Sequence, residues 1–159
     1  MIFVTVGTQM PFDRLVMAVD AWAEGRPDVE AFAQIGPGRA PTHMPHTATL
    51  TPSAFSSRFA RAKLVIAHAG TGSVLAAMEH DVPIIIVPRS AALGEHRDDH
   101  QMATAKHFAG RAGVHVVTDT SDLGGAINQL LTMPRVGAKG AAQADPNLLS
   151  TIRQVIFPQ

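Results

Sequence analysis

The stretch KLVIAHAGTGSVLAAMEHDVPIIIVP, residues 63–88, decides the fold. Its two ends, Lys63–His68 and Val82–Pro88, are short and continuously apolar, and they are rich in β-branched residues. Such runs are typical of strands that are buried on both faces. The segment between them, Gly70–Asp81, predicts a helix. Two buried strands joined by one helix predict a parallel strand–helix–strand unit.

The same alternation extends through most of the chain. The other predicted strands are Ile2–Val6, Val29–Gly36 and Val114–Asp119. The helix after the first strand has Pro11 near its first turn and Gly25 at its end, and Thr51 is placed to cap a later helix. Thr120 or Ser121 is the expected cap of the last one. Buried strands that alternate with helices predict an α/β domain with a doubly wound parallel sheet, Rossmann-like in type.

Composition excludes several classes of protein. A chain of 159 residues with 46% hydrophobic residues makes one domain of ordinary size. The 13 basic and 13 acidic residues balance, which disfavours a nucleic-acid binder that works by general electrostatics. The absence of cysteine excludes disulfides and thiolate nucleophiles. No signal peptide and no apolar run of about 20 residues is visible, so a cytoplasmic protein is expected.

Glycine, hydroxyl and histidine residues gather where ligands bind in such folds, at the carboxyl ends of the strands. The turns expected there are Gly7–Met10, Gly36–Pro41, His68–Ser73 and Arg89–Gln101.

The turn HAGTGS offers the ingredients of an anion site. Gly70 and Gly72 let the backbone approach a ligand, and Thr71 and Ser73 supply hydroxyls at a helix N-terminus, where N–H groups favour an anion. A phosphate or diphosphate is the expected ligand, with His68 as a hydrogen-bond donor. The alternative is that these residues only make the turn and cap the helix.

Gly7 and Thr8 form a similar turn after the first strand and can approach the same anion. Neither turn is a Walker loop, which needs a lysine, and neither matches GxGxxG.

The segment Gly94–Gln101 is the most polar in the chain and has three interpretations. His96 and His100 are four residues apart and suit a metal site. The segment also suits a solvated loop whose aspartates cap the next helix, or hydrogen bonding to sugar hydroxyls. The pair of histidines in His43–His46 raises the same metal question, but its proline-rich context favours a plain loop.

Four motifs resemble a known family: IFVTVGTQMPFDRLV from Ile2, HAGTGS from His68, VPIIIVPR from Val82 and DDHQ from Asp98. Together they resemble the C-terminal, donor-binding half of glycosyltransferase family 28 enzymes of the GT-B fold. The resemblance runs from Met1 to about residue 131. It is strongest to short single-domain members, such as the catalytic subunit of the dolichol-pathway UDP-GlcNAc transferase and bacterial exopolysaccharide and capsule subunits, including the rhizobial glucuronosyltransferase type.

This resemblance implies roles for particular residues. The donor-binding residues it implies are Gly7, Thr8, Gly70, Thr71, Gly72, Ser73, Arg89, Asp99, His100 and Gln101. Both glycine turns would contact the diphosphate, and His68 would stabilise the leaving diphosphate. His100 and Gln101 would contact the donor sugar, with Asp99 beside them. Arg89, Arg97 and Lys106 are candidates to contact the carboxylate of a glucuronate donor.

One position departs from the family pattern. Relatives often carry an acidic residue that holds the ribose on the helix after HAGTGS, and that position is Ala76 here. Glu79 lies one turn later. The departure puts ribose recognition, and the strength of UDP binding by this chain alone, in doubt.

The resemblance also implies a partner. Residues 1–132 would form the nucleotide-sugar-binding domain, 133–146 a linker, and 147–159 a terminal helix that docks on a partner, on its own domain, or on both. No part of the chain corresponds to the acceptor half. A membrane-associated partner subunit would supply it, together with the general base, and recruit the chain to the cytoplasmic face of the membrane.

The expected function is therefore that of a donor-binding catalytic subunit in a two-component inverting glycosyltransferase. It would transfer a hexose or hexuronate from a UDP-sugar to a lipid-linked saccharide in exopolysaccharide biosynthesis, with no metal and no cofactor. The alternative is a non-catalytic nucleotide- or anion-binding regulatory module. A nicotinamide-dependent enzyme is disfavoured, because the first turn lacks GxGxxG and no acidic residue closes the second strand.

Overall fold

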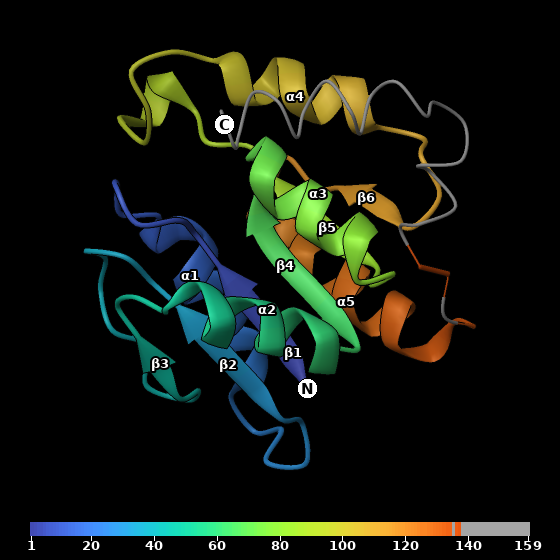
Figure 1. Cartoon of the computed structure of the whole chain (residues 1–159). Helices are drawn as coiled ribbons and strands as arrows, with labels where there is room; N and C mark the ends of the chain where they lie inside the picture. The colour runs from blue at the N-terminus through green and yellow to red at the C-terminus, as the bar shows by residue number, and fades with distance from the viewer. Residues whose placement is uncertain (135, 138–159) are drawn as a thin grey trace.

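A computed structural model describes residues 1–134 and 136–137. Its centre is a sheet of six strands, all paired in parallel, in the order β3-β2-β1-β4-β5-β6 (Figure 1). The order reverses between β1 and β4, the central pair. The strands are β1 Ile2–Thr5, β2 Ala31–Gln34, β3 His46–Thr47, β4 Leu64–His68, β5 Ile84–Val87 and β6 Val114–Val116. The doubly wound parallel sheet predicted from the sequence is confirmed.

Helices cover both faces of this sheet. They are α1 Asp13–Ala23, α2 Pro52–Arg61, α3 Thr71–Glu79, α4 His100–Phe108 and α5 Leu123–Thr132, with short 3₁₀ helices η1 Ala91–Leu93 and η2 Thr120–Asp122. One buried cluster joins α1 and α5 to the face that carries Val4 and Ile66. A second joins α2, α3 and α4 to the opposite face, which carries Phe3 and Val65. Adjacent strand residues thus enter different cores, which is why these strands read as continuous apolar runs.

Side-chain hydrogen bonds cap two of the described helices, and one of these two caps differs from the prediction. Thr51 caps α2, because its side-chain oxygen accepts a hydrogen bond from the Ala54 N–H at 3.3 Å, and Pro52 occupies the first turn. The cap expected at Thr120 or Ser121 is wrong: Asp119 accepts the Ser121 N–H at 2.9 Å instead. A carboxylate is the stronger acceptor, so it starts the turn one residue earlier.

The strands are shorter than predicted at their ends. The first ends at Thr5 rather than Val6, the second spans Ala31–Gln34 rather than Val29–Gly36, and the last ends at Val116 rather than Asp119. Backbone hydrogen bonds to the neighbouring strand still continue one residue past each end, because the N–H groups of Val6, Ile35 and Val117 donate to the carbonyls of Gln34, Thr47 and Ile86. The polar loop predicted after β5 contains η1.

Helices of the described residues are all too short or too polar to cross a membrane. The predicted terminal helix at 147–159, and most of the predicted linker at 133–146, lie outside the described residues.

Candidate functional site

Two glycine turns lie side by side at the carboxyl edge of the sheet, with an imidazole between them. Thr5 pairs with Ala67, so the turns that follow β1 and β4 are neighbours. A Cβ atom on Gly7 would lie 3.3 Å from His68 Cε1, and one on Gly70 would lie 2.3 Å from His68 Nε2. Gly7 also has φ +78°, in the left-handed region. Both glycines are therefore needed to hold His68 in place.

His68 is a neutral side chain. Burial, with a smaller contribution from the charge of Arg89, lowers its pKa to about 4, and the Thr5 backbone opposes the shift. Its Nδ1 atom is buried away from the surface and makes no side-chain hydrogen bond among the described residues. A neutral imidazole carries one N–H, one lone pair and no positive charge, so it can contact a ligand in the cavity without repelling a cation or neutralising an anion.

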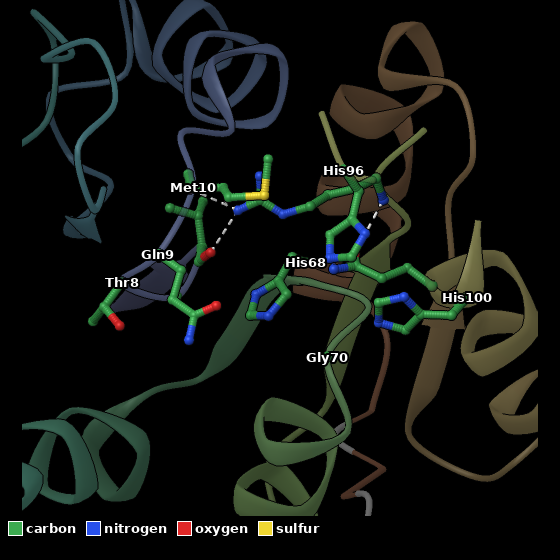
Figure 2. Close-up of a pocket in the computed structure, with 11 residues that line it drawn as sticks. Thr8, Gln9, Met10, His68, Gly70, His96 and His100 are labelled. Carbon is green, nitrogen blue, oxygen red and sulfur yellow. Dashed lines mark hydrogen bonds between the residues drawn. The ribbon is translucent and has the colours of Figure 1, made fainter. Parts of the chain in front are cut away.

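A polar cavity of about 350 Å³ opens on one side of His68 (Figure 2). In Figure 2 the imidazole lies between the Thr8–Met10 turn and the side chains of His96 and His100. The lining residues are Val6, Gly7, Thr8, Gln9, Met10, His68, Gly70, Arg89, His96, His100 and Gln101. Three of the four predicted turns, Gly7–Met10, His68–Ser73 and Arg89–Gln101, contribute to this lining, whereas no residue of Gly36–Pro41 lines either this cavity or the one described next.

A second cavity of about 350 Å³ opens on the other side of His68 and is mostly apolar. It is lined by Thr5, Gly7, Thr8, Gln34, Leu50, Pro52, Phe55, His68, Gly72 and Ser73. Three residues, Gly7, Thr8 and His68, border both cavities. The apolar part of this wall was not predicted; it comes from Leu50, just before α2, and from Pro52 and Phe55 in the first turns of α2.

Helix α3 begins at the boundary between the cavities. Its N-cap is Gly70, and no side chain caps its first turn. The first amides of the helix are thus available to a ligand. Ser73 is buried and borders the apolar cavity, whereas Thr71 borders neither of the two cavities.

Arg89 supports the turn that follows β1 through hydrogen bonds to its backbone carbonyls. It is 3% exposed, and its guanidinium donates to the carbonyls of Val6 at 2.8 Å, Met10 at 2.9 Å and Pro11. It also donates to the Glu95 carbonyl at 3.3 Å. Burial lowers the Arg89 pKa, although Glu95 opposes this. The sequence analysis placed Arg89 near the nucleotide, and the structure shows its guanidinium bound to protein carbonyls.

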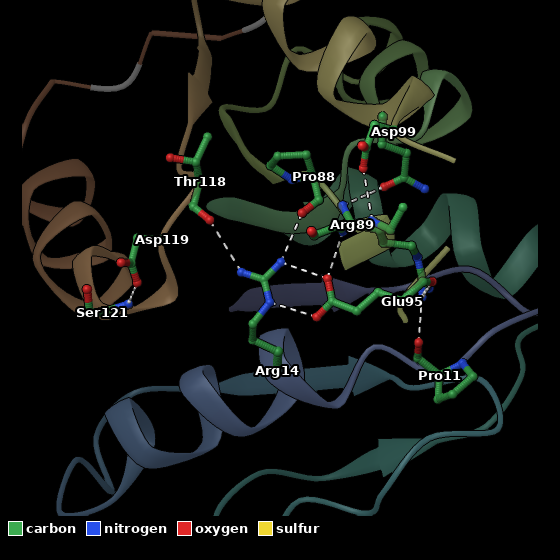
Figure 3. Close-up of polar contacts among 12 residues, drawn as sticks. Pro11, Arg14, Pro88, Arg89, Glu95, Asp99, Thr118, Asp119 and Ser121 are labelled. Atoms are coloured by element: carbon green, nitrogen blue, oxygen red, sulfur yellow. Dashed lines mark hydrogen bonds and ion pairs between the residues drawn. The ribbon is translucent and has the colours of Figure 1, made fainter. Parts of the chain in front are cut away.

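A second arginine fixes the segment after β5 (Figure 3). Arg14 Nε and Nη2 donate to the Glu95 carboxylate at 2.7 and 2.9 Å, and Nη2 also donates to the Pro88 carbonyl at 3.0 Å. Glu95 also accepts the Ser90 N–H at 2.9 Å. Burial raises the Glu95 pKa, but these hydrogen bonds outweigh burial and leave it below its usual value. No local sequence pattern indicates this ion pair, because Arg14 and Glu95 lie 81 positions apart in the chain.

The polar segment 96–101 forms the outer rim of the polar cavity. Buried Gln101 accepts the Arg89 N–H through Oε1 at 3.1 Å. Asp99 is exposed, accepts the Ala91 N–H at 2.9 Å and borders neither cavity. The Asp98 carboxylate, rather than that of Asp99, accepts the His100 N–H that starts α4, at 3.1 Å. His100 borders the cavity, as expected for a ligand contact.

The position that departs from the family pattern lies on α3. Ala76 is half-buried and Glu79 is exposed, and neither borders the two cavities. The structure therefore places no carboxylate from α3 on either cavity wall.

The other histidine pair has a structural role. Asp20, buried on α1, accepts the N–H groups of Thr42 at 3.0 Å and His43 at 2.6 Å. His43 Nδ1 lies 3.3 Å from the same carboxylate, and His46 belongs to strand β3. These contacts hold the proline-rich loop against α1, which agrees with a structural loop rather than a metal site at this histidine pair.

Gln34 is a site residue that the sequence analysis missed. Its Oε1 accepts the Thr5 hydroxyl at 2.7 Å, and its Nε2 donates to the carbonyls of Gly7 and Ala48, each at 2.8 Å. It thereby connects three strand ends and fixes the carbonyl of the first glycine turn.

A doubly wound domain with paired glycine turns, an uncapped helix N-terminus and two cavities at the switch of strand order belongs to the class of nucleotide-binding α/β domains. The model of the glycosyltransferase family 28 C-terminal domain matches residues 1–154. The chain therefore belongs to that family. No curated protein matches it significantly.

Solved structures agree in fold. The calicheamicin glycosyltransferase CalG4 has a TM-score of 0.65 at 19% identity, over 94% of this chain and 38% of its own. The kitacinnamycin glycosyltransferase has a TM-score of 0.63 at 17% identity, and the match covers 96% of this chain and 38% of that enzyme. MurG of Acinetobacter baumannii has a TM-score of 0.60 at 21% identity, and the match covers 96% of this chain and 49% of that enzyme. The chain thus spans less than half the length of these enzymes and has the fold of one part of them.

Proposed function

We propose that this chain is the donor-binding subunit of a two-component inverting glycosyltransferase. It binds a UDP-sugar and, with a membrane-associated acceptor subunit, transfers a hexose or hexuronate to a lipid-linked saccharide in polysaccharide biosynthesis. The observation that carries the proposal is the convergence of two glycine turns and an uncapped helix N-terminus on neutral His68, between one polar and one apolar cavity. Membership of the family supports the reaction class.

The two cavities match the two ends of a nucleotide-sugar. An aromatic base suits the apolar cavity beside Leu50, Pro52 and Phe55. Sugar hydroxyls suit the polar cavity, where His100 and Gln101 offer polar groups. The diphosphate then lies between them, against the residues that border both cavities.

In the transfer step the acceptor hydroxyl attacks the anomeric carbon as the bond from that carbon to the UDP oxygen breaks. The electron pair of that bond goes to the β-phosphate, and the acceptor proton goes to a base on the partner subunit. In this proposal the uncapped amides at the α3 N-terminus, together with an N–H from His68, stabilise the charge that develops. A helix N-terminus contributes about 0.3–1 kcal/mol to an anion, and up to about 2 in a partly buried site. No metal is needed for this step.

Arg89 serves the proposed site indirectly. Its guanidinium is bound to four carbonyls, so it shapes the Gly7 turn rather than neutralising the diphosphate. Arg97 and Lys106, the other two candidates to contact a hexuronate carboxylate, are exposed and line neither cavity. The donor sugars to distinguish are those of UDP-glucuronate, UDP-galactose, UDP-glucose and UDP-GlcNAc.

Thermal unfolding with added nucleotides tests the proposal. The panel contains UDP, the four UDP-sugars, ADP and NAD, each with and without EDTA. A ligand at about 100 times its Kd adds about 2.7 kcal/mol of stability, which raises Tm by several degrees. We expect shifts with uridine ligands only, unchanged by EDTA. Shifts with NAD or ADP would overturn the proposal.

Gly70→Ala should abolish the shift by UDP, because its Cβ displaces the His68 imidazole. Gly125→Ala is the matched control, because Gly125 lies in α5 with open space around it. Equal loss of binding in both variants would contradict the assignment. In the assembled enzyme, His68→Ala should lower turnover far more than it lowers fold stability.

A further inference from the structure

Three metal-ligating side chains converge on the rim of the polar cavity. His96 Nδ1 lies 3.3 Å from Asp98 Oδ1, and His100 Nδ1 makes a hydrogen bond to the same oxygen. The two imidazole rings are 4.5 Å apart between centroids. One ligand atom from each residue lies within 4.8 Å of the others. In the described residues, this is the one group of three such side chains that comes together.

The spacing suits a tetrahedral cation. Zinc binds imidazole nitrogen at about 2.0–2.1 Å and carboxylate oxygen at about 2.0–2.2 Å, so neighbouring ligand atoms in a tetrahedron lie about 3.3–3.5 Å apart. The His96–Asp98 separation falls in that range. His100 Nδ1 is hydrogen-bonded to the same Asp98 oxygen and lies closer than that, so it must move away from the carboxylate for both groups to bind one cation. Gly94, in the left-handed region at φ +70°, turns the chain just before the cluster, and α4 begins at His100, so the three ligands come from one short arc.

We propose that His96, Asp98 and His100 bind a divalent transition metal of the zinc type. Two imidazoles and one carboxylate favour zinc, nickel or copper over magnesium, which prefers oxygen ligands and retains its water. Three protein ligands leave one coordination position open. His96 and His100 both line the cavity, so an exogenous ligand can reach that position from the cavity side.

For metal binding, the hydrogen bond between His100 Nδ1 and the Asp98 carboxylate must be exchanged for bonds from both groups to the cation. His100 is also the side chain proposed to contact the donor sugar, so a bound metal and a bound sugar would share this residue. The metal site itself does not rest on the proposed function.

Calorimetric titration of the whole chain with ZnCl₂, without nucleotide, tests the site. We expect one zinc per chain, weaker by about tenfold or more in His96→Ala and in Asp98→Asn. MgCl₂ should give no heat of binding. The matched control is His107→Ala, which removes an exposed histidine from the same helix, α4. Zinc binding that is unaffected by either rim variant, or absent from the unmodified chain, would overturn the proposal.

A second measurement uses the unmodified chain alone and does not depend on how the variants fold. CoCl₂ should give the visible absorption of tetrahedral cobalt, and EDTA should remove it. The spectrum of aqueous octahedral cobalt would overturn the proposal. Because neither experiment contains nucleotide, its failure is distinct from a failure of the UDP panel.

Discussion

The polar cavity has a floor and a rim that are built in different ways. The floor consists of Gly7, His68, Gly70 and Arg89, and it is packed into the core, with Arg89 only 3% exposed. The rim is the segment 96–101, in which the side chains of Asp98 and His100 are 64% and 58% exposed. Floor residues therefore serve both folding and binding, whereas exposed rim residues are free to serve binding alone. The predictions below test that division.

Arg89→Met should have the largest effect on stability. Met approximates the volume of the arginine stem, but four carbonyls lose a donor in a buried place. Removing one partner from such a buried network costs about 3–5 kcal/mol. Urea unfolding should show this as a lower midpoint. If the free energy of unfolding fell by less than about 1 kcal/mol, the hydrogen bonds of Arg89 would not contribute substantially to stability.

His68 should make stability depend on pH. Its folded pKa of about 4 lies below the ordinary value of 6.5, so the unfolded chain binds the proton more readily. Stability then falls as pH drops from about 6.5 towards about 4, by at most about 3 kcal/mol for a shift of this size. Urea midpoints at several pH values, compared with His68→Gln, measure the effect. A constant difference between the two proteins would contradict a buried neutral imidazole.

Glu95→Gln should have a smaller effect, about 1–2 kcal/mol, because the pair with Arg14 is partly exposed. The Glu95 pKa is lowered in the fold, so its contribution is present above the unfolded pKa and is lost as pH falls through the folded value. Thermal unfolding at pH 7 and in acid measures both. Glu79→Gln, on the exposed side of α3, is the control that should change nothing.

Asp99→Ala should have the smallest effect on the fold, within about 0.5 kcal/mol, because its bond to the Ala91 N–H is exposed. UDP-sugar binding measured by calorimetry should also be unchanged, because Asp99 borders neither cavity. A large drop in Tm would show that the rim is as structural as the floor.

Most of the fold and half of the site could be predicted from sequence. Strands buried on both faces leave a clear apolar signal, and the paired glycine turns with His68 lie where strand ends require them. The rest depends on contacts between distant residues. Nothing local shows that Arg89 faces inward, or that Arg14 reaches Glu95.

The second cavity was missed for a different reason. Its wall at Leu50 and Pro52 follows β3, a strand of only two residues, His46–Thr47. A strand that short has no periodicity to read. Had it been assigned, the rule that ligands bind at carboxyl ends would have included the segment after it.

The order of the strands has a consequence for how the protein is made. Ile2 pairs with Leu64, so the central ladder joins the first strand to one that follows two further strands and two helices. Pairing across such a separation is slow to form, because the intervening chain must be closed into a loop first. His68 and Gly7 meet across this same ladder, one from each side of that long separation. If the chain were cut between Ala62 and Lys63, one fragment would carry the Gly7 turn and the other would carry His68. The polar cavity would then form only when the two fragments reassociate.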